Sequence, residues 1–351
     1  MLIIGCDLHT RFQQIAMLDT ETGEIVTRRL EHANGEAREF YRGLPPGVRV
    51  GIEATGCTQW FERLLAERGH ELWVGDPAEI RARAVRRQKT DARDAELLLD
   101  LLRTGRFPRL WVPTPAERDL RQLLKHRDKL VGMRTSVKNQ LHYLAMSQGV
   151  CRKRQLWSEE GRRELESLEL GLWASQRRAE LLELLDRLDP RIGKLDAAVG
   201  AEVERRADTV RLRQQKGVGP VTALAFVLTV GPVERFRNSR QLVSYLGLNP
   251  SEDSSGGRQR LGHISKQGNQ MLRWLLVEAA QSATQHDPEF RQKYRHLKFR
   301  RGANVAKVAL ARRLAVRMYW ILRQAQSAAS PVRTSGSSAR TVVGQAGPSI
   351  L

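Results

Sequence analysis

The feature that most constrains the fold is a run of short apolar segments at the start of the chain. Residues 2–7, 13–19 and 24–31 have the length and composition of strands, and the turn-prone residues 20–23 separate the last two. These segments predict a three-stranded meander.

Strands and helices alternate after this meander. We expect a polar helix near 35–43, a strand at 48–54, a helix at 58–68, a strand at 71–75 and a helix beyond Pro77. The order β-β-β-α-β-α-β-α is that of the ribonuclease H fold. The sequence therefore predicts an α/β ribonuclease-H-like (RuvC-type) domain over residues 1–112.

Two long amphipathic patterns follow. From Ala116 to about Met146, and again through residues 178–205, apolar side chains recur at intervals of three and four residues. They predict a helical coiled-coil arm over residues 113–208. Helix pairs of this kind commonly build dimers, although packing within one chain explains the pattern equally well. We expect oligomerisation, because the apolar stripes are too long to be covered locally.

The remaining sequence predicts a mostly α carboxy-terminal domain over residues 209–325. Residues 214–231 begin with a glycine hairpin and continue into an apolar helix, which is typical of a helix-hairpin-helix-like element. Two more helices are expected at about 269–284 and 303–324. Residues 326–351 are rich in Ser, Ala and Gly and contain no acidic residue, so we expect a disordered tail.

The charge of the chain points to a polyanionic partner. The 351 residues include 59 Lys and Arg against 39 Asp and Glu, a net charge of +20. The basic residues are spread through apolar, periodic segments rather than confined to one tail, which favours nucleic acid over a ribosomal or membrane-surface role.

Cysteine usage and hydropathy exclude other classes. Cys6, Cys57 and Cys151 lack the spacing of a zinc site or a disulfide framework. The apolar run at the amino terminus is too short for a signal peptide, and no stretch approaches the roughly 18 apolar residues of a membrane span. We expect a cytoplasmic protein without a membrane partner.

Four acidic residues are candidates for a metal site. Asp7 ends the first expected strand and Glu53 lies on the fourth, and these strands are neighbours in the ribonuclease H order. Asp91 and Asp94 are three residues apart, which places both on one helical face. Two Mg²⁺ ions about 3.5–4 Å apart would neutralise these carboxylates and polarise a scissile phosphate. Taken singly, Asp91 could cap its helix, Asp94 could pair with an arginine, and Asp7 could be a turn residue.

Basic residues precede the two aspartates of this helix. This stretch could hold phosphates beside the metal ions, and a solvated helix face is the alternative. Its members are Arg81, Arg83, Arg86, Arg87 and Lys89.

A second constellation surrounds a pair of serines within residues 247–269. Ser255 precedes Gly256, which would let a phosphate approach closely, and cationic neighbours would stabilise an alkoxide and a pentavalent phosphorane. Ser255 is the candidate nucleophile, and Ser254 is the alternative one residue away. A flexible loop whose arginines grip a nucleic-acid backbone explains the composition as well. The cationic neighbours are Arg258, Arg260, His263 and Lys266.

Other basic segments and histidines carry weaker signals. Residues 291–301 and 307–317 are expected to contact nucleic-acid backbone or to form a solvated face. The remaining histidines show no ligand spacing and are expected on the surface or in the core. They are His9, His32, His70, His126, His142, His286 and His296.

Six sequence blocks together resemble the transposases of the insertion-sequence family numbered 110, including its 1111 subgroup. They run in family order from about residue 3 to residue 322. The blocks are CDLHT, GIEATG, KTDARDAELL, KGVGPVTA, YLGLNPSEDSSGGRQRLGHISKQGN and ANVAKVALARRL.

The resemblance implies an active site in two parts. The family's acidic tetrad with its Mg²⁺ corresponds to Asp7, Glu53, Asp91 and Asp94, and its serine corresponds to Ser255. In the family this serine is thought to attack a DNA phosphate and form a phosphoserine linkage, with the acidic tetrad and its Mg²⁺ completing a composite active site. The resemblance implies a homo-oligomer, from a dimer to a tetramer, and the two parts of the site could come from one subunit or from different subunits.

The resemblance also implies a structured guide RNA, the bridge RNA, whose loops pair with donor and target DNA. Such an element would act in a bacterial or archaeal cell, at the nucleoid. One departure is Lys216 in the glycine hairpin, where similar proteins often have proline. A lysine there suits a phosphate partner.

The leading hypothesis is therefore an RNA-guided DNA transposase that works through phosphoserine intermediates. A metal-only junction-resolving nuclease that uses water as its nucleophile is one alternative. A non-catalytic nucleic-acid-binding protein is the other.

Overall fold

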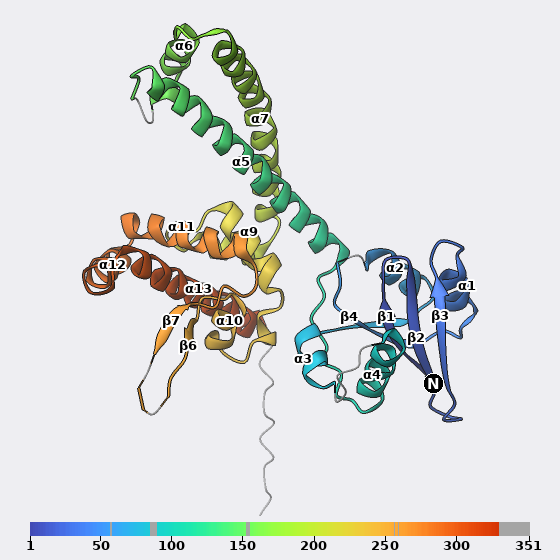
Figure 1. Ribbon diagram of the computed structural model, residues 1–351. Coiled ribbons are helices and arrows are strands. Elements are labelled where there is room, and N and C mark those ends of the chain that lie inside the picture. Colours follow the sequence, from blue (N-terminus) through green and yellow to red (C-terminus); the bar gives the residue numbers. More distant parts are fainter. Residues whose placement is uncertain (57, 85–89, 152–154, 256, 259, 330–351) are drawn as a thin grey trace, which may run out of the picture. The chain divides into compact units, whose positions relative to one another are not determined.

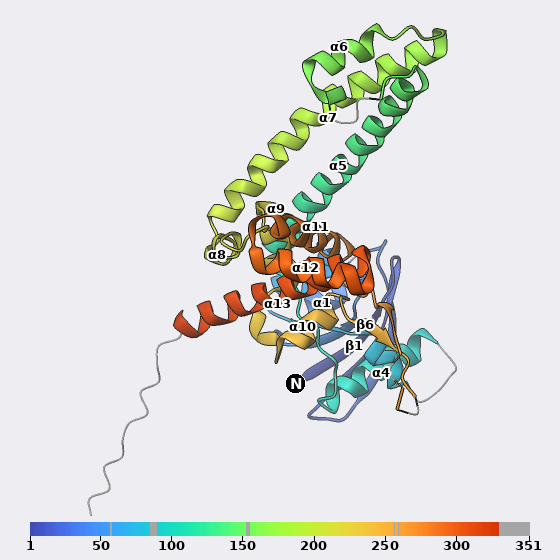
Figure 2. The same ribbon diagram turned by 90° about the vertical axis from the view of Figure 1, so that its left-hand side faces the viewer.

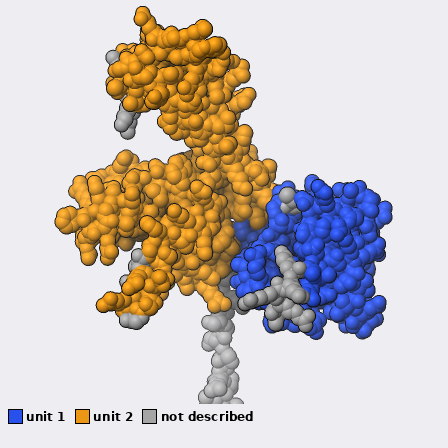
Figure 3. Space-filling model, viewed as in Figure 1, with its two compact units in different colours: residues 1–112 blue, residues 113–351 orange. Residues whose placement is uncertain are grey.

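The computed structural model describes residues 1–56, 58–84, 90–151, 155–255, 257–258 and 260–329. It divides into two compact units, Met1–Val112 and Pro113–Leu351 (Figure 3). Each unit has its own hydrophobic core and is described by itself.

Unit 1 is built on a mixed five-stranded sheet. The strands are β1 (Leu2–Leu8), β2 (Phe12–Asp19), β3 (Ile25–Glu31), β4 (Arg49–Glu53) and β5 (Glu71–Gly75), in the order β3-β2-β1-β4-β5. The meander β1–β2–β3 is antiparallel, whereas β4 pairs with β1 and β5 with β4 in parallel. This arrangement matches the predicted ribonuclease-H-like order, with boundaries within one residue of those expected.

Helices cover both faces of this sheet (Figure 1). The helices are α1 (Glu36–Gly43), α2 (Gln59–Glu67), α3 (Pro77–Ala82) and α4 (Asp91–Arg103). Tyr41 of α1 and Phe61 of α2 belong to one buried cluster with Ile4 of β1, while Leu98 of α4 belongs to another with Ile3. Neighbouring residues of β1 thus face opposite layers, as the two-residue period of a strand requires.

The contact between α4 and β1 depends on a glycine. A Cβ atom at Gly5 would lie 2.2 Å from the carbonyl oxygen of Ala95 and 2.4 Å from the backbone nitrogen of Leu99. The backbone of α4 therefore lies directly against β1, at a distance that any side chain at residue 5 would prevent.

Two helices of 33 residues each form the arm of unit 2. They are α5 (Pro115–Ser147) and α7 (Leu172–Glu204), with η1 (Gln155–Trp157) and α6 (Glu159–Ser167) between them, and they lie side by side in both views (Figures 1 and 2). Val137 and Leu141 of α5 share a buried cluster with Leu185 and Leu188 of α7. The apolar stripes cover each other within the chain, so the expectation that they are too long to be covered locally is wrong, while oligomerisation itself stays a prediction.

The rest of unit 2 is a helical body with one hairpin. Its elements are α8 (Ala207–Arg213), α9 (Pro220–Val230), η2 (Val233–Arg235), α10 (Ser239–Tyr245), β6 (Pro250–Glu252), β7 (Leu261–Ile264), α11 (Gln270–His286), α12 (Pro288–Arg301) and α13 (Ala303–Ala329). Gly217, between α8 and α9, has a φ of 86°, and a Cβ there would lie 2.3 Å from the carbonyl oxygen of Ala279 on α11. The glycine hairpin thus joins two helices and packs against a third.

The structure corrects the predicted carboxy-terminal elements. Helix α12 was not predicted, because Phe290 is its one buried residue and its sequence lacks an apolar period. Helix α13 continues to Ala329, so the expected disordered tail does not begin at residue 326. The remainder of that tail, residues 330–351, lies outside the described residues. Among the helices of the described ranges, none is long and apolar enough to span a membrane.

We predict that Gly5→Ala destabilises the protein. Because the new methyl group meets backbone atoms of α4, we expect a loss of about 1–3 kcal/mol in the free energy of unfolding, measured with urea on the full chain. The matched control is Gly43→Ala at the end of α1, where a Cβ has nothing within 4 Å. That control should be neutral or gain up to about 1 kcal/mol. Equal effects of the two substitutions would contradict the role of Gly5.

Candidate active site

Three side chains of unit 1 converge near the end of β1. Asp7, His9 and Asp91 each offer one ligand atom, and these atoms all lie within 4.8 Å of one another. The Nε2 atom of His9 is 3.1 Å from Oδ2 of Asp7 and 3.6 Å from Oδ1 of Asp91. Asp91 of α4 therefore lies beside Asp7 and His9, although it is far from them in the sequence.

The start of α4 places Asp91 in this cluster. The side chain of Thr90 accepts a hydrogen bond from the backbone N–H of Arg93 and caps the helix, so Asp91 is the first helical residue. Asp91 was one candidate for the N-cap of this helix, but Thr90 is the N-cap. The carboxylate of Asp91 lies in the cluster instead. Asp94 follows one turn later on the same side of the helix.

Asp7 is the most enclosed member of the cluster, with 20 % of its side chain exposed. Partial burial raises the pKa of Asp7 above its ordinary value of 3.8, the charge of His9 opposes this rise, and the charges of Asp94 and Asp91 add to it. The carboxylate of Asp7 is thus held where its negative charge is costly unless a cation lies beside it.

The chemistry of these groups fits a divalent cation. Two carboxylates and an imidazole are donors that such ions accept, and their spacing would let one ion contact all three. The raised pKa of Asp7 reflects the free-energy cost of its negative charge, and a bound cation would lower that cost.

Glu53 stands slightly apart from this cluster. It ends β4, one residue beyond the Cys6–Ile52 pair, so it lies beside Asp7 in the parallel register. Its carboxylate Oε1 is 3.9 Å from Nη2 of Arg81. The structure thus brings Glu53 to the same edge of the sheet, with the guanidinium of Arg81 beside it.

The basic stretch before α4 is described only in part. Arg81 lies near Glu53, and Arg83 donates hydrogen bonds to the carbonyl oxygen of Arg106 and, at 3.3 Å, to Glu79. Arg83 is therefore bound within unit 1. The candidates Arg86, Arg87 and Lys89 lie outside the described residues.

The candidate serine of unit 2 lies on a β-hairpin. Strands β6 and β7 pair antiparallel, and the hairpin projects from the helical body (Figures 1 and 2). The backbone N–H of Asp253 donates to Arg260 at 2.9 Å, and that of Arg258 donates to Ser255 at 3.1 Å, which makes Ser255 the first residue of the closing turn. Where a flexible loop was one interpretation of this segment, the structure has two short strands, β6 and β7, and an isolated bridge between Ser255 and Arg258 beyond them.

The two serines differ in their hydrogen bonds. The Ser254 hydroxyl donates to Glu252 Oε1 at 2.7 Å and accepts from the backbone N–H of Arg260 at 3.1 Å. Ser255 and the predicted cationic neighbours are exposed: Arg258, Arg260, His263 and Lys266. Both serines are exposed, and the difference is that the Ser254 hydroxyl is engaged by Glu252 and Arg260.

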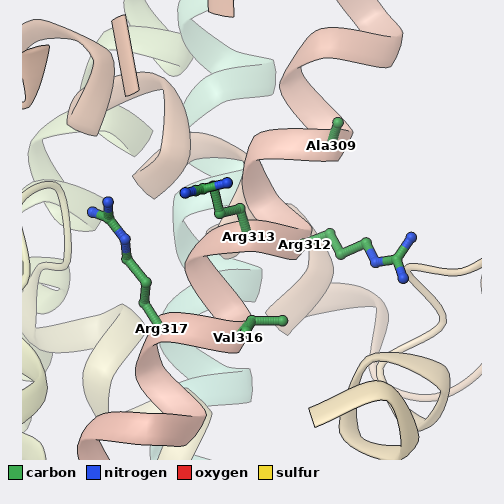
Figure 4. Close-up of a pocket in the computed structure, with 5 residues that line it drawn as sticks. All are labelled: Ala309, Arg312, Arg313, Val316 and Arg317. Carbon is green, nitrogen blue, oxygen red and sulfur yellow. The ribbon is translucent and has the colours of Figure 1, made fainter. Parts of the chain in front are cut away.

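A third basic feature is a groove of about 400 Å³ on α13, lined by arginines (Figure 4). Arg313 donates to Glu289 at 2.6 Å and Arg317 to Asp287 at 2.8 Å. Hydrogen bonding by Lys293, together with the charges of Arg317 and Arg313, lowers the pKa of Glu289. Two arginines of the groove thus join α13 to the start of α12, and Arg312 points to the opposite side of the helix.

His9 is a member of this cluster that the sequence interpretation did not single out. It is exposed, as expected of a surface histidine, but its ring lies beside the carboxylates of Asp7 and Asp91. The relevant signal is the spacing of Asp7 and His9, since residues two apart at the end of a strand lie on the same face. Its ring also packs against Phe12, with centroids 4.6 Å apart.

We predict that Asp7→Asn stabilises the metal-free protein at neutral pH. The pKa of Asp7 is raised by folding, so its charge opposes folding above the raised pKa and has no effect below the ordinary value of 3.8. Urea unfolding in EDTA should show a gain for the variant at pH 7 that disappears as pH falls through this window. The control Asp100→Asn should bring no gain, because Asp100 accepts from Arg103 at 2.8 Å. A loss of stability in Asp7→Asn at pH 7 would contradict the repulsion.

Comparison with known proteins identifies the family to which the chain belongs. A model of insertion-sequence 110 DEDD proteins, described as "Transposase", matches residues 4–146, and one described as "Transposase IS116/IS110/IS902 family" matches residues 210–295. The matched ranges contain the acidic cluster and the serine hairpin respectively.

Relatives of similar length carry the same kind of name. The chain is 31 % identical to the "Probable family 20 transposase" of Pseudomonas aeruginosa, over 93 % of this chain and 98 % of that protein. It is 30 % identical to the "Transposase for insertion sequence element IS1111A" of Coxiella burnetii, over 93 % and 90 %. A third relative is the "Transposase for insertion sequence element IS1328" of Yersinia enterocolitica, at 27 % identity over 91 % and 96 %. The chain therefore belongs to the IS116/IS110/IS902 family of transposases, enzymes that cleave and rejoin DNA.

Proposed function

We propose that this transposase is a serine recombinase that requires Mg²⁺ and forms a phosphoserine intermediate on Ser255. The observation that carries this proposal is the exposure of Ser255 on a cation-rich hairpin, in a unit that does not contain the acidic cluster. We assign residues 1–112 as the nuclease domain, 113–208 as the arm and 209–325 as the domain with the serine.

The proposed cleavage is a transesterification. The Oγ atom of Ser255 loses its proton and attacks the scissile phosphorus, a P–Oγ bond forms, and the P–O3′ bond breaks. The released 3′ oxygen takes up a proton, and the 5′ end of the strand stays attached to the protein. Attack of a 3′ hydroxyl on the phosphoserine reverses these steps and rejoins the DNA without an external energy source.

The cations of the hairpin stabilise the charge of this reaction. Exposed guanidinium groups of Arg258 and Arg260 can contact the non-bridging oxygens of a phosphate, and His263 and Lys266 add further donors. Lys216, which is exposed between α8 and α9, suits a contact with backbone phosphate farther along the nucleic acid.

The acidic residues serve the same reaction through metal ions. Asp7, Asp91, Asp94 and Glu53 would hold two Mg²⁺ ions, which would neutralise charge on the phosphate when bound. The fold sets the positions of these carboxylates, because Asp7 lies on β1 and Asp91 lies at the capped start of α4.

A metal-only nuclease is the competing mechanism. In that case water attacks the phosphate at the acidic site, and the hairpin only binds DNA. The two mechanisms differ in one product, the covalent protein–DNA adduct.

We predict that Ser255→Ala abolishes this adduct. Purified protein, Mg²⁺, RNA transcribed from the flanks of the element and labelled donor and target DNA should give an SDS-resistant adduct at a 5′ DNA end. Ser255→Ala should lower its yield by at least about 10³-fold, as expected for loss of a nucleophile, and Asp7→Ala should impair it.

The neighbouring serine supplies the matched control. Ser254→Ala should retain the adduct, because the Ser254 hydroxyl is engaged by Glu252. The opposite pattern would assign the nucleophile to Ser254, with Glu252 as its base. Cleavage without any adduct in the unchanged protein would favour the nuclease that uses water.

We also propose that a structured guide RNA selects the DNA sites. The net charge of +20 fits nucleic-acid partners in general, and the guide RNA is what the resemblance to the family implies. Base pairing would then read the sequence, while the protein holds backbones. The same reaction without RNA should give little adduct, and equal yields with and without RNA would contradict guidance.

Homo-oligomers, from a dimer to a tetramer, complete the proposal. At the end of the arm where α6 lies, large apolar side chains are exposed despite the pairing of α5 with α7. These are Tyr143 at 68 %, Met146 at 50 %, Leu172 at 75 % and Trp173 at 76 %. Exposed aromatic residues of this kind are typical of interface cores.

We predict that removing them weakens association. Leu172→Ser combined with Trp173→Ser should raise the concentration of half-association by about tenfold or more, as expected for loss of two apolar anchors. Light scattering of the full chain with nucleic acid measures the mass. A control pair on the same helix is Arg187→Ser with Glu183→Ser, which removes an exposed ion pair. A monomeric mass of the unchanged protein would contradict oligomerisation.

A further inference from the structure

The position of His9 carries an inference about the metal site. One ring nitrogen, Nε2, faces carboxylates from two different elements, Asp7 on β1 and Asp91 on α4. The three ligand atoms all lie within 4.8 Å of one another, and Nε2 is within hydrogen-bond distance of Oδ2 of Asp7. One nitrogen and two oxygens are therefore close enough for a single ion to contact all three.

The protein holds the His9 ring in this place. The backbone N–H of His9 donates to the carbonyl oxygen of Phe12 at 3.0 Å and closes the connection between β1 and β2. The Phe12 ring packs against the imidazole at a tilt of 30°. The backbone contact fixes the main chain at His9, and the Phe12 ring together with the Nε2 contact to Asp7 holds the imidazole beside the carboxylates.

We propose that His9 is a metal ligand, which gives one ion of the site a nitrogen donor beside the oxygens of Asp7 and Asp91. This inference rests on the metal site of the proposed function and adds a ligand to it. Glu53 lies 3.9 Å from Arg81 and is outside this group of three ligand atoms within the described part of the chain.

A nitrogen ligand changes which ion the site prefers. Mg²⁺ favours oxygen ligands and keeps several waters, whereas Mn²⁺ accepts imidazole nitrogen. We therefore expect Mn²⁺ to bind more tightly than Mg²⁺, and we expect His9 to account for much of this difference.

The test uses Mn²⁺ as the probe on the full-length protein. Pulsed electron paramagnetic resonance of the Mn²⁺ complex should show the ¹⁴N modulation of a coordinated imidazole. His9→Gln should remove this modulation and lower the Mn²⁺ affinity by about tenfold or more, on the scale of losses around metal sites. It should change the Mg²⁺ affinity less, because the amide oxygen of glutamine remains a ligand that Mg²⁺ accepts.

Three further variants separate the possible outcomes. His126→Ala, which removes an exposed histidine of α5, should leave the ¹⁴N signal unchanged. His9→Ala reports the loss of the side chain, with thermal unfolding as the check on folding. Asp7→Ala should abolish Mn²⁺ binding at the site.

If Mn²⁺ binds in an Asp7-dependent way without ¹⁴N modulation, and His9→Gln has no effect, His9 is only a counter-charge and the inference is wrong. The metal site of the proposed function would survive that result. If Asp7→Ala does not change Mn²⁺ binding, both the inference and the proposed metal site are overturned.

Discussion

The direct contact of the α4 backbone with β1 is the constraint on which unit 1 depends. Gly5 allows this contact, because a Cβ there would lie 2.2 Å from the carbonyl oxygen of Ala95. Asp7 is two residues beyond Gly5 on the same face of the strand, and Asp91 is one helical turn before Ala95. The distance between the two carboxylates is therefore set by backbone packing rather than by the carboxylates, which repel each other. A substitution far from the chemistry can change the site by moving this helix.

The carboxylates of the cluster repel one another. The fold tolerates this repulsion because its free-energy cost is small compared with the stabilisation from the apolar side chains buried nearby. Ile3, Leu98 and Leu99 are buried on the face of the sheet where α4 packs. Full burial of one such side chain stabilises by about 1.5–3 kcal/mol, so a few of them outweigh one carboxylate of raised pKa. The packing around α4 thus holds Asp7 in a place where its negative charge is unfavourable. At this residue, the stability of the fold and the proposed binding of a metal ion oppose each other.

The sequence predicted the parts of the fold in which apolar period and chain order agree. The five strands of unit 1 were found because each is a short apolar run, and α5 and α7 because their apolar residues repeat at intervals of three and four. Helix α12 was missed because Phe290 is its one buried residue, and β6–β7 was read as a loop because its serines and glycines carry no period. The same reasoning explains the site. Asp7 and Asp91 could be predicted from their places at the end of a strand and the start of a helix. His9 could not, because its partners lie on two elements that only the folded chain brings together.

Keeping acids and cations on different elements has an electrostatic reason. Where the two kinds of side chain meet, they neutralise each other, as Arg313 and Arg317 do with Glu289 and Asp287 at the start of α12. Arginines so engaged have little left to offer a phosphate. On the hairpin, by contrast, the Glu252 carboxylate accepts from the Ser254 hydroxyl, and Arg258 and Arg260 are exposed. In the proposed function, the acids that would hold metal ions lie on β1, β4 and α4, and the cations that would contact phosphate lie on the hairpin. Each proposed site therefore has an excess of one charge, although His9 lies beside Asp7 and the hairpin also carries Glu252 and Asp253.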